Sequence, residues 1–321
     1  MNTKERLQIL YDTELKPQLA EMEKMRRFVK RWRAFAITSL ILAFLFLYSD
    51  YVVLRILGGA GFFAGAIYAA VLALRTYNKY HKQFKTEVVR KVVHLINPDY
   101  KYNSAKHIEV YEYNKAALFK CKAERCIGDD LVFGKIDKTP FKFSEVKTQY
   151  KTTTTNDEGK KVTEWHTIFR GLFFFAEFNK NLEGQTFVFP EKDRTVTNFL
   201  GKEKEESRIH GELVKLENPE FEKIFSVYST SQQEARYVLT PLMMEAIVTI
   251  YNTFGFKMYF SFRGENVFCA IPFNRNLFEP SIKRSGVNFR DVEEMYMLFG
   301  LIKTLVQEMN LNTRIWTKSW N

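Results

Sequence analysis

The most apolar part of the chain runs from Ala34 to Leu74, about twice the roughly 20 residues that a membrane-spanning helix needs. Asp50 and Arg55 interrupt the middle of this run. The pattern predicts two spans joined by a short turn, the first from about residue 33 to residue 48 or 51 and the second from about 52 to 74. Asp50 and Arg55 are expected at the turn, and a charge pair acting within the membrane is the alternative.

Basic residues flank the apolar run on both sides, whereas the turn holds one Arg and one Asp. Because positively charged flanks stay in the cytoplasm, we expect both termini there and the turn outside. Trp32 and Tyr48 are expected at the membrane interfaces as aromatic anchors. The basic residues are Lys24, Arg26, Arg27, Lys30, Arg31 and Arg33 before the run, and Arg75, Lys79, Lys82 and Lys85 after it.

The second predicted span contains "GGAGFFAGA", in which Gly61 and Gly65 have G-x-x-x-G spacing. Small residues at this spacing let two helices approach closely. We expect Gly61 and Gly65 to pack helices, either against the first span or between two copies of the chain.

Four segments are predicted: an amphipathic cytoplasmic helix over 1–32, a transmembrane hairpin over 33–75, a juxtamembrane helix over 76–98, and a soluble domain over 99–321. Pro17 should kink the first helix or mark a start within it. The apolar positions of that helix recur at steps of three to five residues, which is typical of an amphipathic helix; they are Leu7, Leu10, Leu15, Leu19, Met22 and Met25.

The soluble part combines strand and helix patterns. "FKFSEVKTQYKTTTT" and "VTEWHTIFRGLFFFAEF" predict the two arms of a long hairpin, and "KMYFSFRGENVFCAIPF" predicts another that turns at "RGEN". Thr240 should cap a helix that stops at Gly255, and Asn288 should cap a final helix. The fold class is therefore α+β, an N-terminal two-helix transmembrane hairpin followed by a cytoplasmic domain of antiparallel strands covered by a few helices.

The positive charge is concentrated near the apolar run. Residues 1–100 carry 16 Lys and Arg against 8 Asp and Glu, and the rest carries 32 against 29. This distribution favours an anionic membrane surface and argues against a nucleic acid partner. Cys121, Cys126 and Cys269 are too few and too irregular for a disulfide framework and indicate reduced thiols.

No catalytic motif is recognisable: G-x-S-x-G, a P-loop, G-x-G-x-x-G and H-E-x-x-H are all absent from the sequence. We therefore expect no catalytic residue, no cofactor and no metal site, and favour a protein that is not an enzyme. Asp129-Asp130 could bind a cation, but an acidic pair at the start of a strand more often forms a turn.

Two polar clusters are candidate ligand-binding residues. Glu234 and Arg236 lie in "QQEARYVLTP", where Arg236 is either paired structurally or adds to an anion site at the following helix. The second cluster lies in "IPFNRNLFEPSIKRS", a basic and aromatic loop that either contacts lipid headgroups or only connects two elements. Its members are Arg275, Glu279, Lys283 and Arg284.

Three stretches carry a resemblance to a known family: "FRGLFFFAEFNKNLEGQTFVFP", "PEFEKIFSVYSTSQQEARYVLTPLMMEAI" and "FSFRGENVFCAIPFNRNLFEPS". They resemble the bacterial family Domain of Unknown Function 3137 over roughly residues 100–285. The resemblance implies two N-terminal membrane helices, a soluble region and the bacterial inner membrane. It implies no activity, substrate or catalytic residue.

The leading hypothesis is a membrane-anchored cytoplasmic binding or scaffold protein that recognises a protein partner or lipid headgroups at the inner membrane. One alternative is an enzyme with an unfamiliar site around Glu234, Arg236 and Glu279. Another is an accessory subunit of a membrane transporter that docks through the Gly-rich span.

Overall fold

The structure, a computed structural model, describes residues 3–155, 159–191 and 209–313. It divides into two compact units. The helical unit comprises Met1–Ile96 together with Phe278–Met297, and the sheet unit comprises Asn97–Leu277 together with Leu298–Asn321. The sequence places residues 278–297 in the expected soluble domain over 99–321, whereas the structure groups them with the N-terminal helices.

The N-terminal helix changes its winding just before Pro17. Helix α1 (Thr3–Leu10) continues through a π-helical turn (Tyr11–Leu15) into α2 (Lys16–Phe46). Proline donates no backbone hydrogen bond to the preceding turn, and a wider π-helical turn lies where that bond is lost. Pro17 therefore marks a start within the helix, as the sequence predicts.

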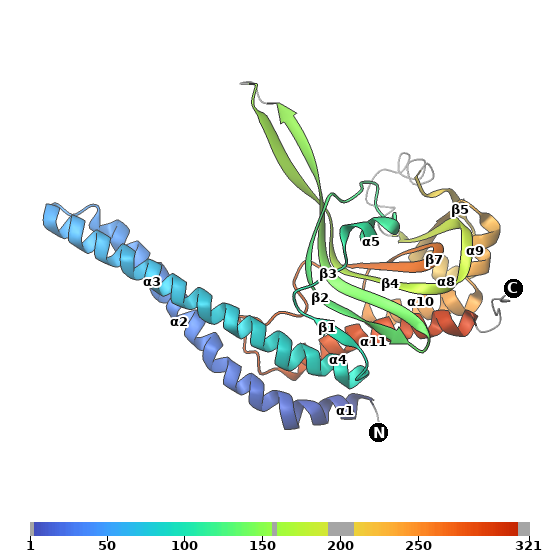
Figure 1. The fold of residues 1–321 in the computed structure, drawn as a ribbon, viewed down its shortest axis with the longest axis horizontal. Coiled ribbons are helices and arrows are strands. Elements are labelled where there is room, and N and C mark those ends of the chain that lie inside the picture. Colours follow the sequence, from blue (N-terminus) through green and yellow to red (C-terminus); the bar gives the residue numbers. More distant parts are fainter. Residues whose placement is uncertain (1–2, 156–158, 192–208, 314–321) are drawn as a thin grey trace. The chain divides into compact units, whose positions relative to one another are not determined.

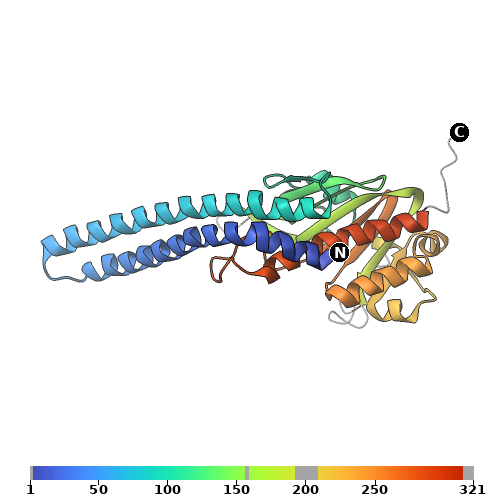
Figure 2. The same ribbon diagram turned by 90° about the horizontal axis from the view of Figure 1, so that it is seen from below.

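Helices α2 and α3 (Val52–Phe84) run side by side in opposite directions (Figure 2), and α3 continues through a π-helical turn (Lys85–Val89) into α4 (Arg90–Ile96). Small side chains lie between the two helices and allow close packing. The buried members of this inner face are Ser39, Ala43, Gly59, Ala66, Ala69 and Ala73.

Among the described residues, one helix is long and apolar enough to cross a membrane, the stretch Val52–Ile96 formed by α3 and its continuation. The apolar part of α2 is shorter because Lys30, Arg31 and Arg33 come directly before Ala34 and the helix ends at Phe46. Helix α3 therefore corresponds to the second predicted span, whereas the first predicted span stays a prediction.

The sheet unit is built around one seven-stranded antiparallel sheet in the order β1-β2-β3-β4-β6-β5, with β7 also paired to β4 (Figure 1). The strands are β1 (Lys101–Asn103), β2 (Arg125–Ile136), β3 (Thr139–Thr155), β4 (Lys161–Pro190), β5 (Glu212–Val214), β6 (Phe225–Ser229) and β7 (Tyr259–Pro272). The predicted hairpin of "FKFSEVKTQYKTTTT" and "VTEWHTIFRGLFFFAEF" is confirmed as β3 and β4.

Strand β4 is the centre of the sheet. One of its edges pairs with β3 up to Ala176 and with β6 from Thr186, and the other edge pairs with β7 from Gly171 to Val188. Both faces of β4 are covered, since Phe173 packs at 4.9 Å from the ring of Tyr113 while its neighbour Phe174 is buried on the opposite face. This double burial explains the unbroken run of Phe residues.

The predicted hairpin at "RGEN" is wrong. Residues Tyr259–Pro272 form the single strand β7, which pairs with β4 over Phe260–Gly264 and again over Asn266–Pro272. Gly264 has φ +56°, and it lies beside an irregularity in β4 between Leu182 and Gln185. The turn-like residues therefore stay within β7, and the extra residues of this irregularity belong to β4, since the consecutive Gly264 and Arg263 pair with Leu182 and Gln185.

The ends of the remaining helices follow local signals. These helices are α5 (Val110–Lys115), α8 (Pro219–Ile224), α9 (Gln232–Val238), α10 (Pro241–Phe254) and α11 (Phe289–Thr313), which extends from the helical unit into the sheet unit. Thr240 accepts a hydrogen bond from Met243 N, and Gly255 ends α10 with φ +66°. Asn288 accepts from Arg290 N at 3.1 Å. These three predicted helix ends are confirmed.

We expect Gly171→Ala to lower the free energy of unfolding by about 3 kcal/mol. Gly171 has φ +153°, and a Cβ atom there would lie 2.1 Å from the carbonyl oxygen of Ile271. Gly300→Ala is the matched control: it has open space within α11 and should raise the free energy by about 0.5–1 kcal/mol. Urea denaturation of the detergent-solubilised protein measures both, and equal effects would contradict the prediction.

Candidate functional site

A polar pocket of about 330 Å³ lies in the sheet unit, where β2, β3 and β4 meet the segment that follows β7. It contains side chains of both charge signs. Its lining residues are Ile127, Gly128, Asp129, Glu145, Val146, Lys147, Arg170, Gly171, Arg275, Asn276 and Leu277. Four segments distant in sequence thus contribute to one cavity.

The acidic side of the pocket arises from a bulge in β2. Asp129 pairs with Glu145, but the next paired residue is Val132, so Asp130 is part of an insertion between two regular pairs. Asp130 has φ +59°, a left-handed conformation that Asp adopts more readily than most residues. It is fully buried and accepts a hydrogen bond from the hydroxyl of Tyr102.

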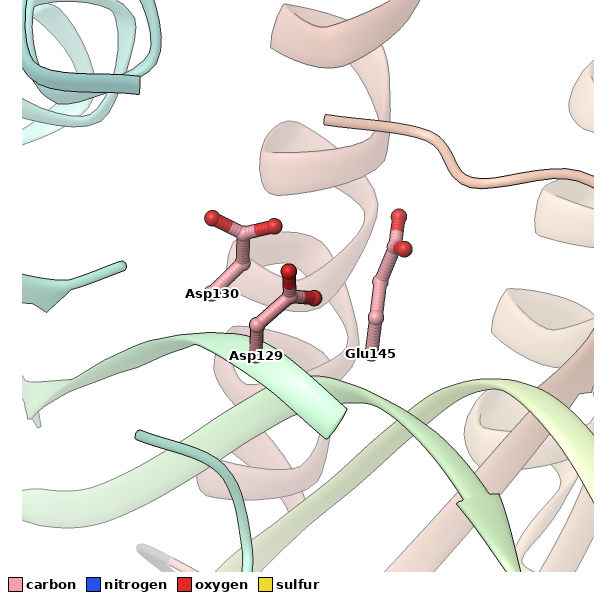
Figure 3. Close-up of side chains that lie close together, drawn as sticks. All are labelled: Asp129, Asp130 and Glu145. Carbon is pink, nitrogen blue, oxygen red and sulfur yellow. The ribbon is translucent and has the colours of Figure 1, made fainter. Parts of the chain in front are cut away.

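The bulge brings three carboxyl groups together. Asp129, Asp130 and Glu145 extend from the sheet in the same direction (Figure 3), and one oxygen of each lies within 4.8 Å of the others. Oxygen ligands in such a group suit a divalent cation, and they also suit an ammonium group. The pattern around Asp129-Asp130 favoured a turn, and Glu145 is too remote in sequence for that pattern to place it beside them.

The basic side of the pocket comes from β4 and the segment after β7. Arg170 Nη2 donates to Asn276 Oδ1 at 2.7 Å, and the backbone oxygen of Arg170 accepts from Phe273 N at 3.1 Å. Leu277 N donates to Glu145 Oε1 at 2.5 Å. These bonds hold the segment carrying Arg275 against the acidic strands, so the pocket can accommodate a positive and a negative group at once.

Of the predicted ligand-binding residues, Arg275 lies in this pocket, and Glu234 and Arg236 have other surroundings. The Glu234 carboxylate accepts from Glu183 N at 3.1 Å and Gly184 N at 2.6 Å. Arg236 donates to the backbone oxygens of Gln232 at 3.2 Å and Lys215 at 3.3 Å. Both side chains therefore bond to backbone groups, and Arg236 is exposed, so a buried charge pair and an anion site both stay predictions for it.

Glu279, Lys283 and Arg284 belong to the helical unit, in the segment Phe278–Met297. Glu279 Oε1 lies 3.0 Å from Nε2 of His81 on α3, and Arg284 Nη2 lies 2.9 Å from Asp291 Oδ1. The two clusters of candidate residues thus divide between the units, and the hypothesis of an enzyme site around Glu234, Arg236 and Glu279 stays a hypothesis.

A buried ion pair holds the same returning segment to α2, which the sequence analysis missed. The Glu23 carboxylate accepts from Arg26 Nε at 2.8 Å and Nη2 at 2.5 Å, and Arg26 Nη1 donates to the backbone oxygen of Ile282 at 2.9 Å. Arg26 and its neighbour Arg27 lower the pKa of Glu23 to about 2. The signal in the sequence was Glu23 three and four positions before two Arg residues.

Two bonds from the returning segment complete this contact, which we call the Glu23 clamp: Glu23, Arg26, Ile282, Ser285 and Gly286. Ser285 Oγ and Gly286 N each donate to Glu23 Oε2 at 3.4 Å. Arg26, which the sequence analysis counted among the basic residues facing the membrane surface, is 9% exposed. The charge of Arg26 is therefore paired with Glu23 inside the protein.

Gly61 and Gly65 face open space, with no atom near the position of an added Cβ. Gly58 and Gly59 are the glycines beside α2, where an added Cβ would lie 2.8 Å from Phe46 and 3.7 Å from the Ala43 oxygen. Helix packing by Gly61 and Gly65 therefore stays a prediction that concerns a partner outside this hairpin.

Comparisons with known proteins found one matching family model and one weakly similar solved structure. Residues 167–311 match the model of the family described as "Protein of unknown function (DUF3137)". The crystal structure of the mycobacterial trehalose monomycolate transport factor A, TtfA, is similar with a TM-score of 0.32 and 12% identity, covering 68% of this chain and 96% of that one. The comparison with curated proteins gave no significant match.

We expect Glu23→Gln to remove part of the acid sensitivity of the protein. The pKa of Glu23 is about 2 when folded, against about 4.3 for an unfolded chain. A lowered pKa stabilises the fold fully above the unfolded value, and this contribution is lost as the pH falls from about 4.3 to about 2. Urea denaturation at neutral and acid pH should therefore show a smaller acid-induced loss for Glu23→Gln than for the natural protein.

Arg27→Gln is the matched control, because its side chain is 67% exposed and lies 3.3 Å from the same carboxylate. It should change the free energy of unfolding by less than about 1 kcal/mol and keep most of the acid-induced loss. An acid-induced loss of the same size in Glu23→Gln and the natural protein would contradict the assignment of Glu23.

Proposed function

We propose that this chain, which belongs to the family of proteins of unknown function DUF3137, is a membrane-anchored binding protein. The apolar ends of α2 and α3 form the anchor in this proposal. The sheet unit stays in water and provides the binding surface. This function deepens the interpretation of the sequence as a binding or scaffold protein and requires no catalytic step.

The observation that carries the anchor is the apolar surface of the helix pair. Large apolar side chains between Phe35 and Leu74 point outward instead of into a core. Ile37, Phe44, Leu57 and Tyr68 are 61, 58, 69 and 62% exposed. A continuous apolar surface of this extent is costly in water and favourable in lipid.

We propose that the helix pair enters the bacterial inner membrane from the cytoplasm and crosses it twice, with both termini inside. The basic residues on both sides of the apolar run support this orientation. Asp50 is exposed in the turn and Arg55 lies one turn into α3, so both would be placed near the outer headgroups. In this proposal the lipid bilayer is one binding partner of the chain.

Labelling of Ser49→Cys tests this orientation. In a Cys121→Ser background, Ser49→Cys at the turn should react with a membrane-impermeant maleimide in intact spheroplasts. The remaining thiols are poor targets because burial raises the pKa of Cys126 to about 12 and Cys269 is fully buried. Thr154→Cys, on the exposed end of β3, is the matched control and should react only in inside-out vesicles.

Labelling of both positions from one side would show that the hairpin does not cross the membrane. Labelling with the two sides exchanged would reverse the proposed orientation. Recovery of the chain in the soluble fraction would contradict the anchor itself.

We further propose that the pocket of the sheet unit binds a zwitterionic headgroup such as phosphoethanolamine. The specific observation is that opposite charges line one cavity: the carboxylates of Asp129 and Glu145 together with the basic groups of Lys147, Arg170 and Arg275. Carboxylates recognise an ammonium group, and guanidinium groups recognise a phosphate. Lipid headgroups were one of the two partners expected from the sequence.

Calorimetric titration of the detergent-solubilised protein with glycerophosphoethanolamine tests this site. We expect Glu145→Gln to weaken binding by about tenfold, because a charged hydrogen bond to the ammonium group is replaced by a neutral one. Glu212→Gln, an exposed residue on β5, is the matched control and should leave binding unchanged. Equal binding of glycerol phosphate would show that only an anion is recognised, and no binding of either would contradict the site.

A further inference from the structure

The helix pair carries aromatic side chains at two levels along its length. At the level nearer the basic residues, the rings of Trp32 on α2 and Tyr68 on α3 lie 6.2 Å apart. At the turn, Tyr48 and Tyr51 are each 76% exposed. Trp and Tyr are enriched where the hydrocarbon core of a bilayer meets the headgroups. The two levels therefore mark the two edges of the surface that lipid would cover.

The separation of these levels follows from the helix rise. Trp32 and Tyr48 are sixteen positions apart on one side of the hairpin, which corresponds to about 24 Å. Tyr51 and Tyr68 are seventeen positions apart on the other side, which corresponds to about 25 Å. Both helices thus give the same spacing, although they differ in sequence.

Helix α2 limits the apolar length of the helix pair. Arg33 lies directly after Trp32, and its guanidinium is 5.1 Å from the ring centre of Tyr77 on α3. Helix α3 alone is apolar from Val52 to Leu74 apart from Arg55, which would span about 33 Å. At the level of Leu74, however, the basic residues of α2 stand beside it, so the extra apolar length of α3 does not lengthen the pair.

The two helices are not free to slide and remove this mismatch. The rings of Phe46 and Phe62 stack at 5.3 Å near the turn, and Gly58 lies against Phe46. The turn is closed by hydrogen bonds from Tyr48 N to Leu45 O at 3.1 Å and from Ser49 N to Phe46 O at 3.2 Å. The register of α2 against α3 is therefore fixed at the end that enters the membrane.

We propose that the hairpin fits a bilayer whose hydrocarbon core is thinner than the usual value of about 30 Å. This inference rests on the proposed membrane anchor. A helix pair that is too long can tilt, but tilting a pair that is too short only shortens it further. The bilayer must thin around it, or Arg33 and Arg55 must extend toward the headgroups. The partner that this surface matches best is a membrane with short acyl chains.

Cell-free synthesis of the full chain in the presence of vesicles tests the proposal. The vesicles contain phosphatidylcholine with monounsaturated chains of increasing length, from dimyristoleoyl through dioleoyl to dierucoyl. Protein that floats with the vesicles after an alkaline wash is counted as inserted. We expect the inserted fraction to fall by about tenfold from the shortest to the longest chains, since each ångström of mismatch has a modest cost.

Two variants test whether α2 determines the preferred lipid chain length. Arg31→Leu combined with Arg33→Leu lengthens the apolar part of α2 and should move the best insertion to longer chains. Arg75→Leu is the matched control, because it removes one positive charge from α3, whose apolar part is already long, and should leave the preference unchanged. Protease protection of the inserted protein verifies that each variant retains a folded sheet unit.

The outcomes separate the two proposals. No insertion into any vesicle would overturn the membrane anchor. Equal insertion into all vesicles, or best insertion into the thickest, would overturn the thin-bilayer inference and leave the anchor intact. A shift by Arg75→Leu as large as that of the α2 variant would also overturn it, because α2 would then not be limiting.

Discussion

The sheet unit depends on one constraint, which is that β4 keeps a partner on both edges at Gly171–Ala176 and again at Thr186–Val188. Strands β3 and β7 pair with β4 on either side of Gly171, and the adjacent Arg170 lines the polar pocket. The bulge in β2 then turns Asp130 inward beside Glu145. The pocket is therefore a product of sheet register, and the same backbone pairing that forms the core positions its charges.

The helical unit is held together by different interactions at its two ends. Small residues join α2 to α3 where large apolar side chains face outward, while charges join α2 to the returning segment near Glu23. Buried charges need well-placed partners, and Arg26 has one carboxylate and one carbonyl. A run of basic residues thus contains two kinds of charge, some at a surface and one within a contact.

Local signals predicted the elements that depend on local bonds. Thr240 and Gly255 bound α10 because a cap and a left-handed residue act within one helical turn. The hairpin at "RGEN" was wrong because only the distant β4 could reveal that β7 continues through Gly264. The pocket was missed for the same reason: Asp129, Glu145, Arg170 and Arg275 are remote in sequence. Only Arg275 was among the predicted residues.

The Glu23 clamp also has a consequence for biosynthesis. Arg26 and the carbonyl of Ile282 are separated by 256 positions, so the ribosome makes the first partner long before the second. During that interval Glu23 and Arg26 have each other but lack the backbone of the returning segment. While the sheet is translated, the helix pair is held by its own contacts, which include the small-residue face and the stack of Phe46 on Phe62. The bond from Arg26 to Ile282 thus forms only after every strand of the sheet, up to β7, has been translated.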